Sequence, residues 1–573
     1  MMREMEYIQV LRGTTMNRKN AAFLVIAMIA LGLAACAAGR AFTRGDAPEG
    51  AGTETGSGAE KKISPKLRAQ DSKAAEMEAP AELARAPSAS PALAPAPAPD
   101  VESLASVPVP VPGQAPVPAE EAPNTDEYNE IVENVFKDPR QEPLSTFSID
   151  VDKASYANVR NYLNEGSLPP PDAVRIEELV NYFAYDYPEP KGEHPFSITT
   201  EYADSPWKAD SKLFLIGIQG KRLDFNSLKP CNLVFLIDTS GSMSDQNKLP
   251  LLKEALALLV KNLSARDRIA IVAYAGSAGI VLDSTRASEA DTIIAAMDAL
   301  ASGGSTAGGE GIELAYLTAK KNYLPGGNNR VILCTDGDFN VGRSSTGDLV
   351  DLITEKRKED IYLTICGFGM GNYKDGRMEE ISKAGNGNYF YIDSRKEAEK
   401  VFVKEMRANM FTIAKDVKIQ LEFNPKAVQA YRLIGYENRL MAAEDFADDT
   451  KDAGELGPGH TVTALYEILP APSASGDLLT VKFRYKPIKS DVSIPIELAV
   501  GADSVALGRA SPNFRFAASV AEFGMLLRES KFAGNASWTS LIELAGGARG
   551  QDEEGYRAEF IGLAQKAKKL SGE

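Results

Sequence analysis

Three loops of the sequence carry oxygen-bearing side chains at spacings that suit a small divalent cation. The first loop, "DTSGS", places Asp238, Ser240 and Ser242 directly after an apolar run. The second, "GGSTAGG", holds Thr306 between glycines, and the third has Asp336 at the end of another apolar run. Carboxylates and hydroxyls without thiolate or imidazole form the ligand set that Mg²⁺ or Mn²⁺ prefers. The alternative is that such loops only cap helices and make turns.

The segments around these loops predict how they are positioned. Between residues 231 and 395, apolar runs such as "CNLVFLID" and "RVILCTDG" alternate with helical patterns such as "KLPLLKEALALLVKNL". Continuous apolar strands joined by helices predict a mostly parallel sheet covered on both faces. Ligands on such sheets bind at the carboxyl ends of the strands. We therefore expect the three loops to meet at one edge.

The order D-x-S-x-S, then Thr in a Gly-rich loop, then T-D-G resembles the metal-ion-dependent adhesion site of von Willebrand factor type A (VWA) domains. The resemblance implies that Asp238, Ser240 and Ser242 hold the cation directly or through water. It implies that Thr306 coordinates in the ligand-bound form and that Asp336 acts through water or directly. By the same analogy, ligand binding shifts the last helix of the domain, at about 395–413.

A wider resemblance covers the chain from about Asp126 to the C-terminus. The segments "PLSTFSIDVDKASYANVR", "TDGDFNVG", "GNGNYFYID" and "LIGYENR" are similar to the bacterial YfbK-like lipoproteins that contain a VWA domain. This resemblance implies membership of a family and little about mechanism.

The predicted fold class is α/β, with a doubly wound, mostly parallel sheet of the VWA or Rossmann-like type over 231–413. Alternating strand patterns in 195–230 and 414–510 predict a β-sandwich that contains or flanks this domain. Helical segments are expected at 126–194 and 511–573.

Two local features of the N-terminal helical segment are predicted. The spacing of apolar residues in 126–136 predicts a helix. Asp152 is expected to be the N-cap of a second helix that follows a strand. Asp150 and Asp152 could also ligate a metal, but capping and turn formation are the favoured roles.

The beginning of the chain has the composition of a targeting segment. Residues 1–35 contain a basic stretch, a short apolar run and small residues, which is typical of a secretory signal peptide with Met16 as the start. "LAAC" resembles a lipobox, so Cys36 is the expected lipidation site; a plain signal peptide or a membrane anchor is the alternative. Ala37 favours sorting to the outer membrane, facing the periplasm. The Ala/Pro-rich stretch 36–125 is expected to be a disordered tether.

Composition and charge narrow the function further. The chain of 573 residues has a formal net charge of −16, which argues against a nucleic-acid partner. Cys231, Cys334 and Cys366 lie in apolar runs and are expected to be buried hydrophobes rather than a disulfide framework. His194 and His460 are far apart in the sequence, which argues against a histidine-based zinc or catalytic cluster. The acidic stretch "EDFADDTKDAGE" is expected to be a solvated loop, with a Ca²⁺ site as the alternative.

These observations favour an envelope lipoprotein whose VWA domain binds a partner protein through Mg²⁺ or Mn²⁺. An acidic residue of the partner is the expected ligand in the open coordination position, and the membrane is reached through the lipid. No catalytic residues are predicted. The alternatives are a structural envelope protein whose metal stabilises the fold and, less favoured, a metal-dependent hydrolase.

Overall fold

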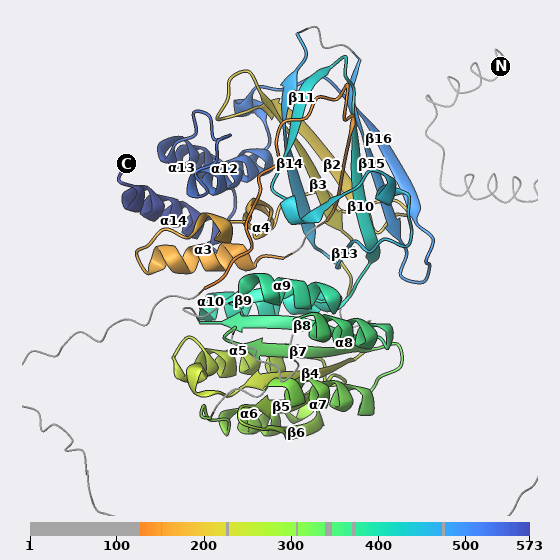
Figure 1. Cartoon of the computed structure of the whole chain (residues 1–573), viewed down its shortest axis with the longest axis vertical. Coiled ribbons are helices and arrows are strands. Elements are labelled where there is room, and N and C mark those ends of the chain that lie inside the picture. Colours follow the sequence, from red (N-terminus) through yellow and green to blue (C-terminus); the bar gives the residue numbers. More distant parts are fainter. Residues whose placement is uncertain are drawn as a thin grey trace, which may run out of the picture. The chain divides into compact units, whose positions relative to one another are not determined.

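The computed structural model describes residues 126–149, 152–224, 228–304, 308–337, 346–369, 374–472 and 476–573. The signal peptide, Cys36, the tether, Thr306 and Asp150 lie outside these ranges. Within them the strands form three sheets, one in an α/β domain and two in a β-sandwich (Figure 1).

The sheet of the α/β domain is built around β4 (Cys231–Asp238), every residue of which is buried. Its strand order is β6-β5-β4-β7-β8-β9. The strands β5, β4, β7, β8 and β9 run parallel to one another, and the edge strand β6 is antiparallel to β5. Their bounds are Arg268–Tyr274 (β5), Ala278–Arg286 (β6), Asn328–Thr335 (β7), Ile361–Phe368 (β8) and Tyr389–Ile392 (β9). The prediction of a mostly parallel, doubly wound sheet is confirmed.

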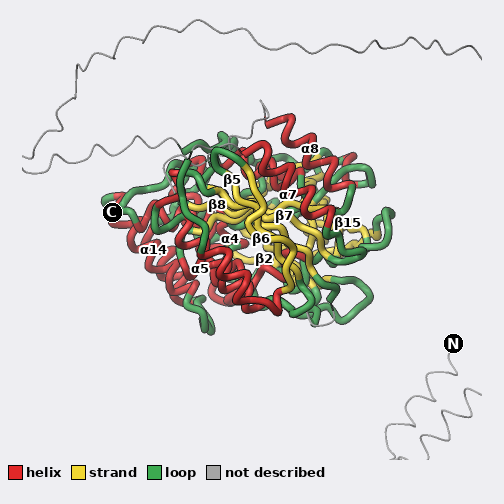
Figure 2. The backbone as a smooth tube through the Cα atoms, turned by 90° about the horizontal axis from the view of Figure 1, so that it is seen from below, coloured by secondary structure: helices red, strands yellow, loops and turns green. Residues whose placement is uncertain are grey.

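Helices cover both faces of this sheet, as the view from below in Figure 2 shows. One hydrophobic core lies between the sheet and α5, α6 and the final helical stretch, and the other lies between the sheet and α7, α8 and α9. The helices are α5 (Leu249–Asn262), α6 (Ala290–Asp298), α7 (Gly308–Lys321), α8 (Thr346–Lys358) and α9 (Asp375–Ala384). The final stretch consists of α10 (Arg395–Glu399), a π-helical turn η5 (Lys400–Glu405) and α11 (Met406–Met410).

The β-sandwich is made of two antiparallel sheets with the strand orders β12-β1-β10-β15-β16 and β11-β14-β3-β2. The first contains β1 (Leu144–Ser148), β10 (Ala414–Phe423), β12 (Leu440–Met441), β15 (Asp477–Lys486) and β16 (Ile494–Gly501), and β13 (Gly454–Leu456) pairs with β10. The second contains β2 (Phe196–Asp204), β3 (Lys212–Gly220), β11 (Val428–Ile434) and β14 (Thr461–Pro470). Because β3 precedes the α/β domain and pairs with β14, which follows it, the α/β domain is inserted in the sandwich.

A helical layer covers the outer face of the second sheet. It combines α3 (Ala154–Asn164) and α4 (Ile176–Asn181) with α12 (Pro512–Leu527), α13 (Trp538–Gly547) and α14 (Tyr556–Ser571). Their core also contains Trp207 and Leu213 from the sandwich. Short 3₁₀ turns are η1 (Pro171–Ala173), η3 (Gly241–Ser244), η4 (Ala287–Glu289), η6 (Glu437–Arg439), η7 (Glu444–Phe446) and η8 (Leu507–Arg509).

Residues 126–136 do not form the expected helix; apart from an isolated bridge between Glu127 and Lys374 they have no regular secondary structure. The backbone of this region pairs with other segments: the N–H of Ile131 donates to Asp172 (2.9 Å), and Lys137 bridges to Tyr431. Two of the apolar residues that suggested a helix, Val132 and Val135, are exposed. Pairing with distant segments therefore outweighs the local helical pattern.

Asp152 is not the N-cap of α3, because Lys153 occupies that position and makes no side-chain cap. The carboxylate of Asp152 instead accepts hydrogen bonds from the backbone N–H of Tyr389 (3.2 Å) and from Arg439 (2.9 Å). The first turn of α3 is capped from another helix, since the N–H of Ser155 donates to Glu178 (2.8 Å).

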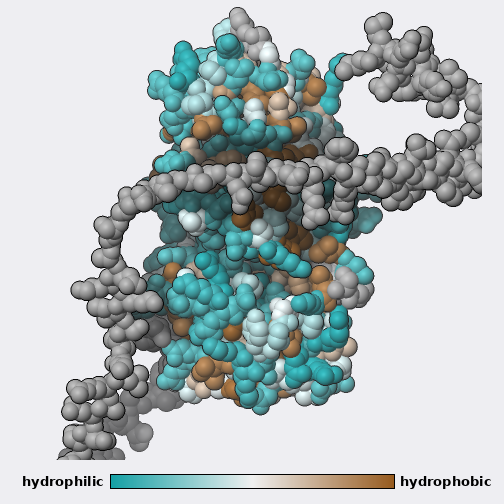
Figure 3. Space-filling model, turned by 90° about the vertical axis from the view of Figure 1, so that its right-hand side faces the viewer, coloured by the Kyte–Doolittle hydropathy of each residue, from teal (hydrophilic) through white to brown (hydrophobic). Residues whose placement is uncertain are grey.

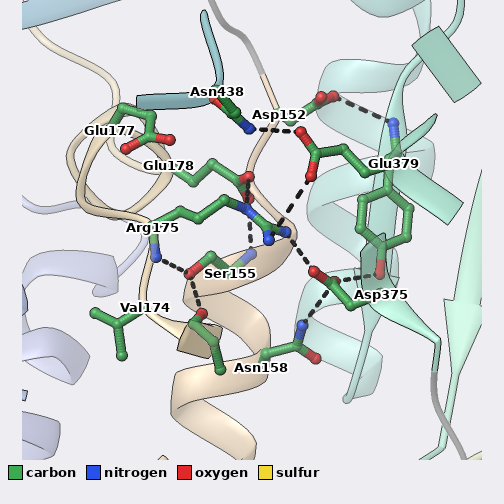
Figure 4. Close-up of polar contacts among 12 residues, drawn as sticks. Asp152, Ser155, Asn158, Val174, Arg175, Glu177, Glu178, Asp375, Glu379 and Asn438 are labelled. Atoms are coloured by element: carbon green, nitrogen blue, oxygen red, sulfur yellow. Dashed lines mark hydrogen bonds and ion pairs between the residues drawn. The ribbon is translucent and has the colours of Figure 1, made fainter. Parts of the chain in front are cut away.

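A buried ionic network joins the helical layer to α9 of the α/β domain (Figure 4). Arg175 contacts Glu178 and lies 2.7 Å from Asp375 and 3.8 Å from Glu379. Asp375 also accepts a hydrogen bond from the hydroxyl of Tyr389 (2.7 Å). Burial acts to raise the pKa of Glu379, but Arg175 and neighbouring cations outweigh it and lower the pKa to about 2.

A second arginine links the same layer to the beginning of the last helical stretch. Arg160 lies 2.6 Å from Asp393, 2.7 Å from Glu397 and 2.9 Å from Glu559 of α14. The two networks show that the α/β domain is held against the helical layer by buried charge pairs.

One face of the described surface is mostly polar. Figure 3 shows the side that lies to the right in Figure 1, where hydrophilic residues predominate and hydrophobic residues form scattered patches. Ile494 and Leu498 of the edge strand β16 are among the exposed apolar residues. None of the helices in the described ranges is long and apolar enough to cross a membrane.

Replacing Arg175 is expected to destabilise the protein. Arg175→Met leaves Asp375, Glu178 and Glu379 buried without their arginine, and breaking a buried charge network in this way costs about 3–5 kcal/mol. Arg222→Met is the matched control, because Arg222 pairs with Glu189 at an exposed site and such pairs contribute at most about 1 kcal/mol. Equal free energies of unfolding for the two variants in urea would contradict the role given to Arg175.

Acid is expected to destabilise the protein through His460. Burial, followed by the nearby cation Lys153, lowers the pKa of His460 to about 4. Glu405 acts to raise this pKa, and Lys400 acts to lower it. The unfolded chain therefore binds a proton at His460 as pH falls below about 6.5, and stability is lost from there down to about pH 4. His460→Gln should lose about 2 kcal/mol less than the wild type between pH 7 and pH 4 in urea unfolding. Parallel pH profiles for the two proteins would show that this histidine does not titrate as described.

Candidate metal centre

Three neighbouring strands of the α/β sheet end at the same edge in polar residues. Asp238 is the last residue of β4, Tyr274 the last of β5 and Thr335 the last of β7, with Asp336 directly after it. All four side chains are buried. Since β4, β5 and β7 are parallel neighbours, their carboxyl ends bring these side chains together.

The carboxylate of Asp238 is held by three donors. Its Oδ1 accepts the backbone N–H of Ser240 (2.9 Å), and its Oδ2 accepts the hydroxyls of Tyr274 (3.0 Å) and Thr335 (3.4 Å). Burial raises the pKa of Asp238, and the negative charge of Asp336 adds to this, although the bonds from Ser240 and Tyr274 act in the opposite direction.

The two serines of the first loop face each other across one turn of 3₁₀ helix. The hydroxyls of Ser240 and Ser242 lie 3.0 Å apart. Backbone bonds fix this loop against the start of the Gly-rich loop: the N–H of Gly241 donates to Gly304 (3.2 Å), and the N–H of Gly303 donates to Thr239 (2.8 Å). The second loop therefore begins at the same edge, although Thr306 itself lies outside the described residues.

The two oxygens of Asp336 have different surroundings. Oδ2 accepts a bond from the ammonium group of Lys248 (3.0 Å), which also donates to the backbone oxygen of Ser242 (3.0 Å). Oδ1 is buried and has no hydrogen-bond partner among the described residues. A buried carboxylate oxygen without a partner is costly and is a position where a cation can bind.

The described residues fit a small divalent cation. Asp238 and Asp336 supply carboxylates, Ser240 and Ser242 supply hydroxyls, and one carboxylate oxygen is open. This set is made of hard oxygen donors, as Mg²⁺ or Mn²⁺ requires. No group of three or more His, Cys, Asp or Glu suited to a metal is found in the described ranges.

Three residues of this edge were not singled out from the sequence. Tyr274 and Thr335 both donate to Asp238, and Lys248 contacts Asp336. Thr335 is the first residue of the T-D-G motif, so its position at a strand end was a usable signal. Lys248 follows Ser242 by six residues, but sequence spacing alone does not show where the end of a long side chain lies.

The other polar candidates do not join this site. Cys231, Cys334 and Cys366 are buried, as expected, and burial raises the pKa of Cys334. His460 instead lines a separate cavity of about 310 Å³. The lining of this cavity includes none of the four described residues of the predicted metal site.

The acidic stretch near residue 450 is more ordered than a solvated loop. Lys418 donates to the backbone oxygen of Asp445 (3.0 Å), and Asp449 bonds to Ser493 and lies 3.5 Å from Arg484. These contacts pack the loop on the sandwich.

Comparison with known protein families agrees with this architecture. The model of the von Willebrand factor type A domain matches residues 232–404, and one described as von Willebrand factor matches 122–215. The model of the C-terminal region of the uncharacterized protein YfbK matches 408–476 and 471–570.

The relative that decides the family is the uncharacterized protein YfbK of Escherichia coli (strain K12). It is 42% identical over 471 residues, which cover 78% of this chain and 81% of that protein. The chain belongs to the YfbK family of VWA-domain proteins. The expected family and the α/β fold class with a VWA domain are thereby confirmed.

More distant relatives share parts of the chain. The uncharacterized protein sll0103 of Synechocystis sp. is 28% identical over 217 residues, covering 37% of this chain and 49% of that protein. A solved structure described as von Willebrand factor type A from Catenulispora acidiphila is 16% identical, covers 68% of this chain and 99% of that chain, and has a TM-score of 0.39.

Mg²⁺ is expected to stabilise the folded protein through this centre. A ligand at a hundredfold excess over its dissociation constant adds about 2.7 kcal/mol to the free energy of unfolding. In Asp238→Asn this gain should be lost, because the variant removes one of the two buried carboxylates. Asp283→Asn, at an exposed position of β6, is the control and should respond like the wild type. Thermal unfolding in MgCl₂ and in EDTA measures the effect, and an Asp238→Asn protein that still gained stability from Mg²⁺ would contradict the site.

Proposed function

We propose that this chain is a metal-dependent protein-recognition module. Mg²⁺ or Mn²⁺ is held by Asp238, Ser240 and Ser242, with Thr306 and Asp336 as further ligands. VWA domains commonly bind these metals at such a site and generally mediate protein–protein interactions. The observation that carries the proposal is the open, buried Oδ1 of Asp336 at the edge where the two serine hydroxyls meet.

The chemistry of the cation indicates what the partner supplies. Mg²⁺ prefers six oxygen ligands in a near-octahedral arrangement and keeps water where the protein offers no ligand. Two carboxylates and neutral hydroxyls leave room for one more anionic oxygen. A partner's Asp or Glu side chain provides such an oxygen, and the cation then bridges the two proteins.

Recognition is favoured over catalysis by the groups that surround the described part of the site. The hydroxyls of Tyr274 and Thr335 donate to Asp238, and the ammonium of Lys248 contacts Asp336. These groups are engaged in holding the two carboxylates and are therefore poorly placed to act as a nucleophile with its base. Asp338, the other acidic residue of the third loop, lies outside the described residues.

The proposed setting is the cell envelope. Lipidation at Cys36 would attach the chain to a membrane, most simply the outer membrane with the folded body in the periplasm. The Ala/Pro-rich stretch 36–125 would then space the recognition module from the lipid surface.

Capture of a partner should depend on both the metal and Asp238. We expect crosslinking and pull-down with the wild-type chain to recover a partner protein in MgCl₂ and to lose that partner in EDTA. Asp238→Ala should lose the partner in both conditions, and Asp283→Ala should behave like the wild type.

Capture that persists in EDTA and in Asp238→Ala would contradict metal-bridged recognition. Metal-dependent thermal stability without metal-dependent capture would point instead to a structural role for the metal. Phosphatase and protease assays of the same samples, with and without Mg²⁺, test the hydrolase alternative.

A further inference from the structure

Lys248 is built into the metal centre rather than lying on its surface. It directly precedes α5, and its side chain is 7% exposed. The ammonium group lies 3.0 Å from both Asp336 Oδ2 and the backbone oxygen of Ser242, and 3.6 Å from Asp245. The backbone of Lys248 is fixed at the start of α5, and its ammonium group is fixed by these contacts, so the long side chain has a defined position.

The stem of Lys248 runs through a slot that a glycine keeps open. Gly369 follows β8 with φ +75°, and a Cβ there would lie 2.2 Å from Cε of Lys248. The backbone oxygen of Gly369 accepts a hydrogen bond from the hydroxyl of Tyr391 (2.6 Å), which fixes the wall of the slot. The stem of Lys248 therefore fits because residue 369 is a glycine and has no side chain.

Lys248 contacts only one of the two oxygens of the Asp336 carboxylate. Its ammonium group takes Oδ2, and Oδ1 stays without a partner among the described residues. Asp336 is thus oriented before any cation arrives, with one oxygen presented to the site. In this sense Lys248 is a positioning residue that acts through Asp336.

The lysine also sets the charge of the centre. Among the charged groups buried at this edge, Asp238, Asp336 and Lys248 sum to a net charge of −1, whereas the two carboxylates alone sum to −2; Asp245, which also lies near the lysine, is exposed. With a dication bound, the centre carries +1 in the presence of the lysine and no net charge in its absence. The ammonium group repels the metal and then strengthens the attraction of the loaded centre for an anion.

We propose that Lys248 is a built-in counter-cation that weakens metal binding and makes the loaded centre selective for an anionic ligand. This inference rests on the proposed metal site and specifies how that site chooses its partner. The partner's carboxylate is favoured over a neutral oxygen ligand because the loaded centre is positively charged. The ion pair between Lys248 and Asp336 holds the residues of the centre in place without a cation.

The test compares the full chain with Lys248→Met, which keeps the stem and removes the charge, and with Lys248→Arg, which keeps the charge. Calorimetric titration with MnCl₂ should give a dissociation constant about tenfold lower for Lys248→Met than for the wild type. Lys248→Arg should stay within about threefold of the wild type, since a cation still faces Asp336. Lys248→Gln provides a second neutral variant in case Lys248→Met does not fold.

A second readout measures the selectivity for anions. Acetate added to the Mn²⁺-loaded protein displaces metal-bound water, which lowers the relaxation rate of the water protons. Acetate should bind the wild type about tenfold more tightly than the neutral variants, because the loaded centre then carries the extra positive charge. Acetamide, which is neutral, should show no such difference.

The outcomes separate this inference from the proposed function. Tighter Mn²⁺ binding together with weaker acetate binding in the neutral variants supports the role of Lys248. Unchanged or weaker Mn²⁺ binding in these variants overturns the proposed counter-cation role, leaves Lys248 only as a residue that positions Asp336, and leaves the metal site intact. A wild-type chain that binds neither Mn²⁺ nor Mg²⁺ overturns the proposed function and the role of Lys248 with it.

Discussion

The candidate metal centre depends on two buried carboxylates that lie at one edge of a parallel sheet. Asp238 and Asp336 end neighbouring strands and are both fully buried, so their charges repel each other where little water screens them. Hydroxyl and amide donors stabilise Asp238, and the ammonium group of Lys248 donates to one oxygen of Asp336. The negative charge that remains is the basis on which we propose a cation at this edge, with the hydroxyls of Ser240 and Ser242 as its neutral ligands.

The rest of the fold holds this edge in place. The α/β domain is inserted between strands of a β-sandwich, and β3 and β14, on either side of it in the sequence, pair directly. Arg175 holds α9 and Arg160 holds the residues around α10, both through buried carboxylates. The loop before α9 begins at Gly369, the residue that packs on Lys248.

The sequence predicts much of this arrangement because its patterns are strong where burial is complete. The apolar run of β4, the serine spacing after Asp238 and the T-D-G motif predict the sheet and the edge at which the site lies. The split of the sandwich is also readable from strand patterns before and after the domain. The irregular course of 126–136 depends on contacts outside the segment, such as the one with Asp172. The carboxylate of Asp152 contacts Tyr389 and Arg439, which lie hundreds of residues away in the sequence. Lys248 belongs to the same class, since only the fold shows that its ammonium group reaches Asp336.

The central claim is that one dication binds between the side chains of Asp238, Ser240, Ser242 and Asp336. A crystal of the full chain soaked in MnCl₂, with an anomalous difference map collected near the manganese edge, tests it most directly. We predict a single strong peak in coordination contact with both serine hydroxyls, with Lys248 still bound to Oδ2 of Asp336. A map without a peak at this edge, at a manganese concentration that saturates binding elsewhere, would contradict the account.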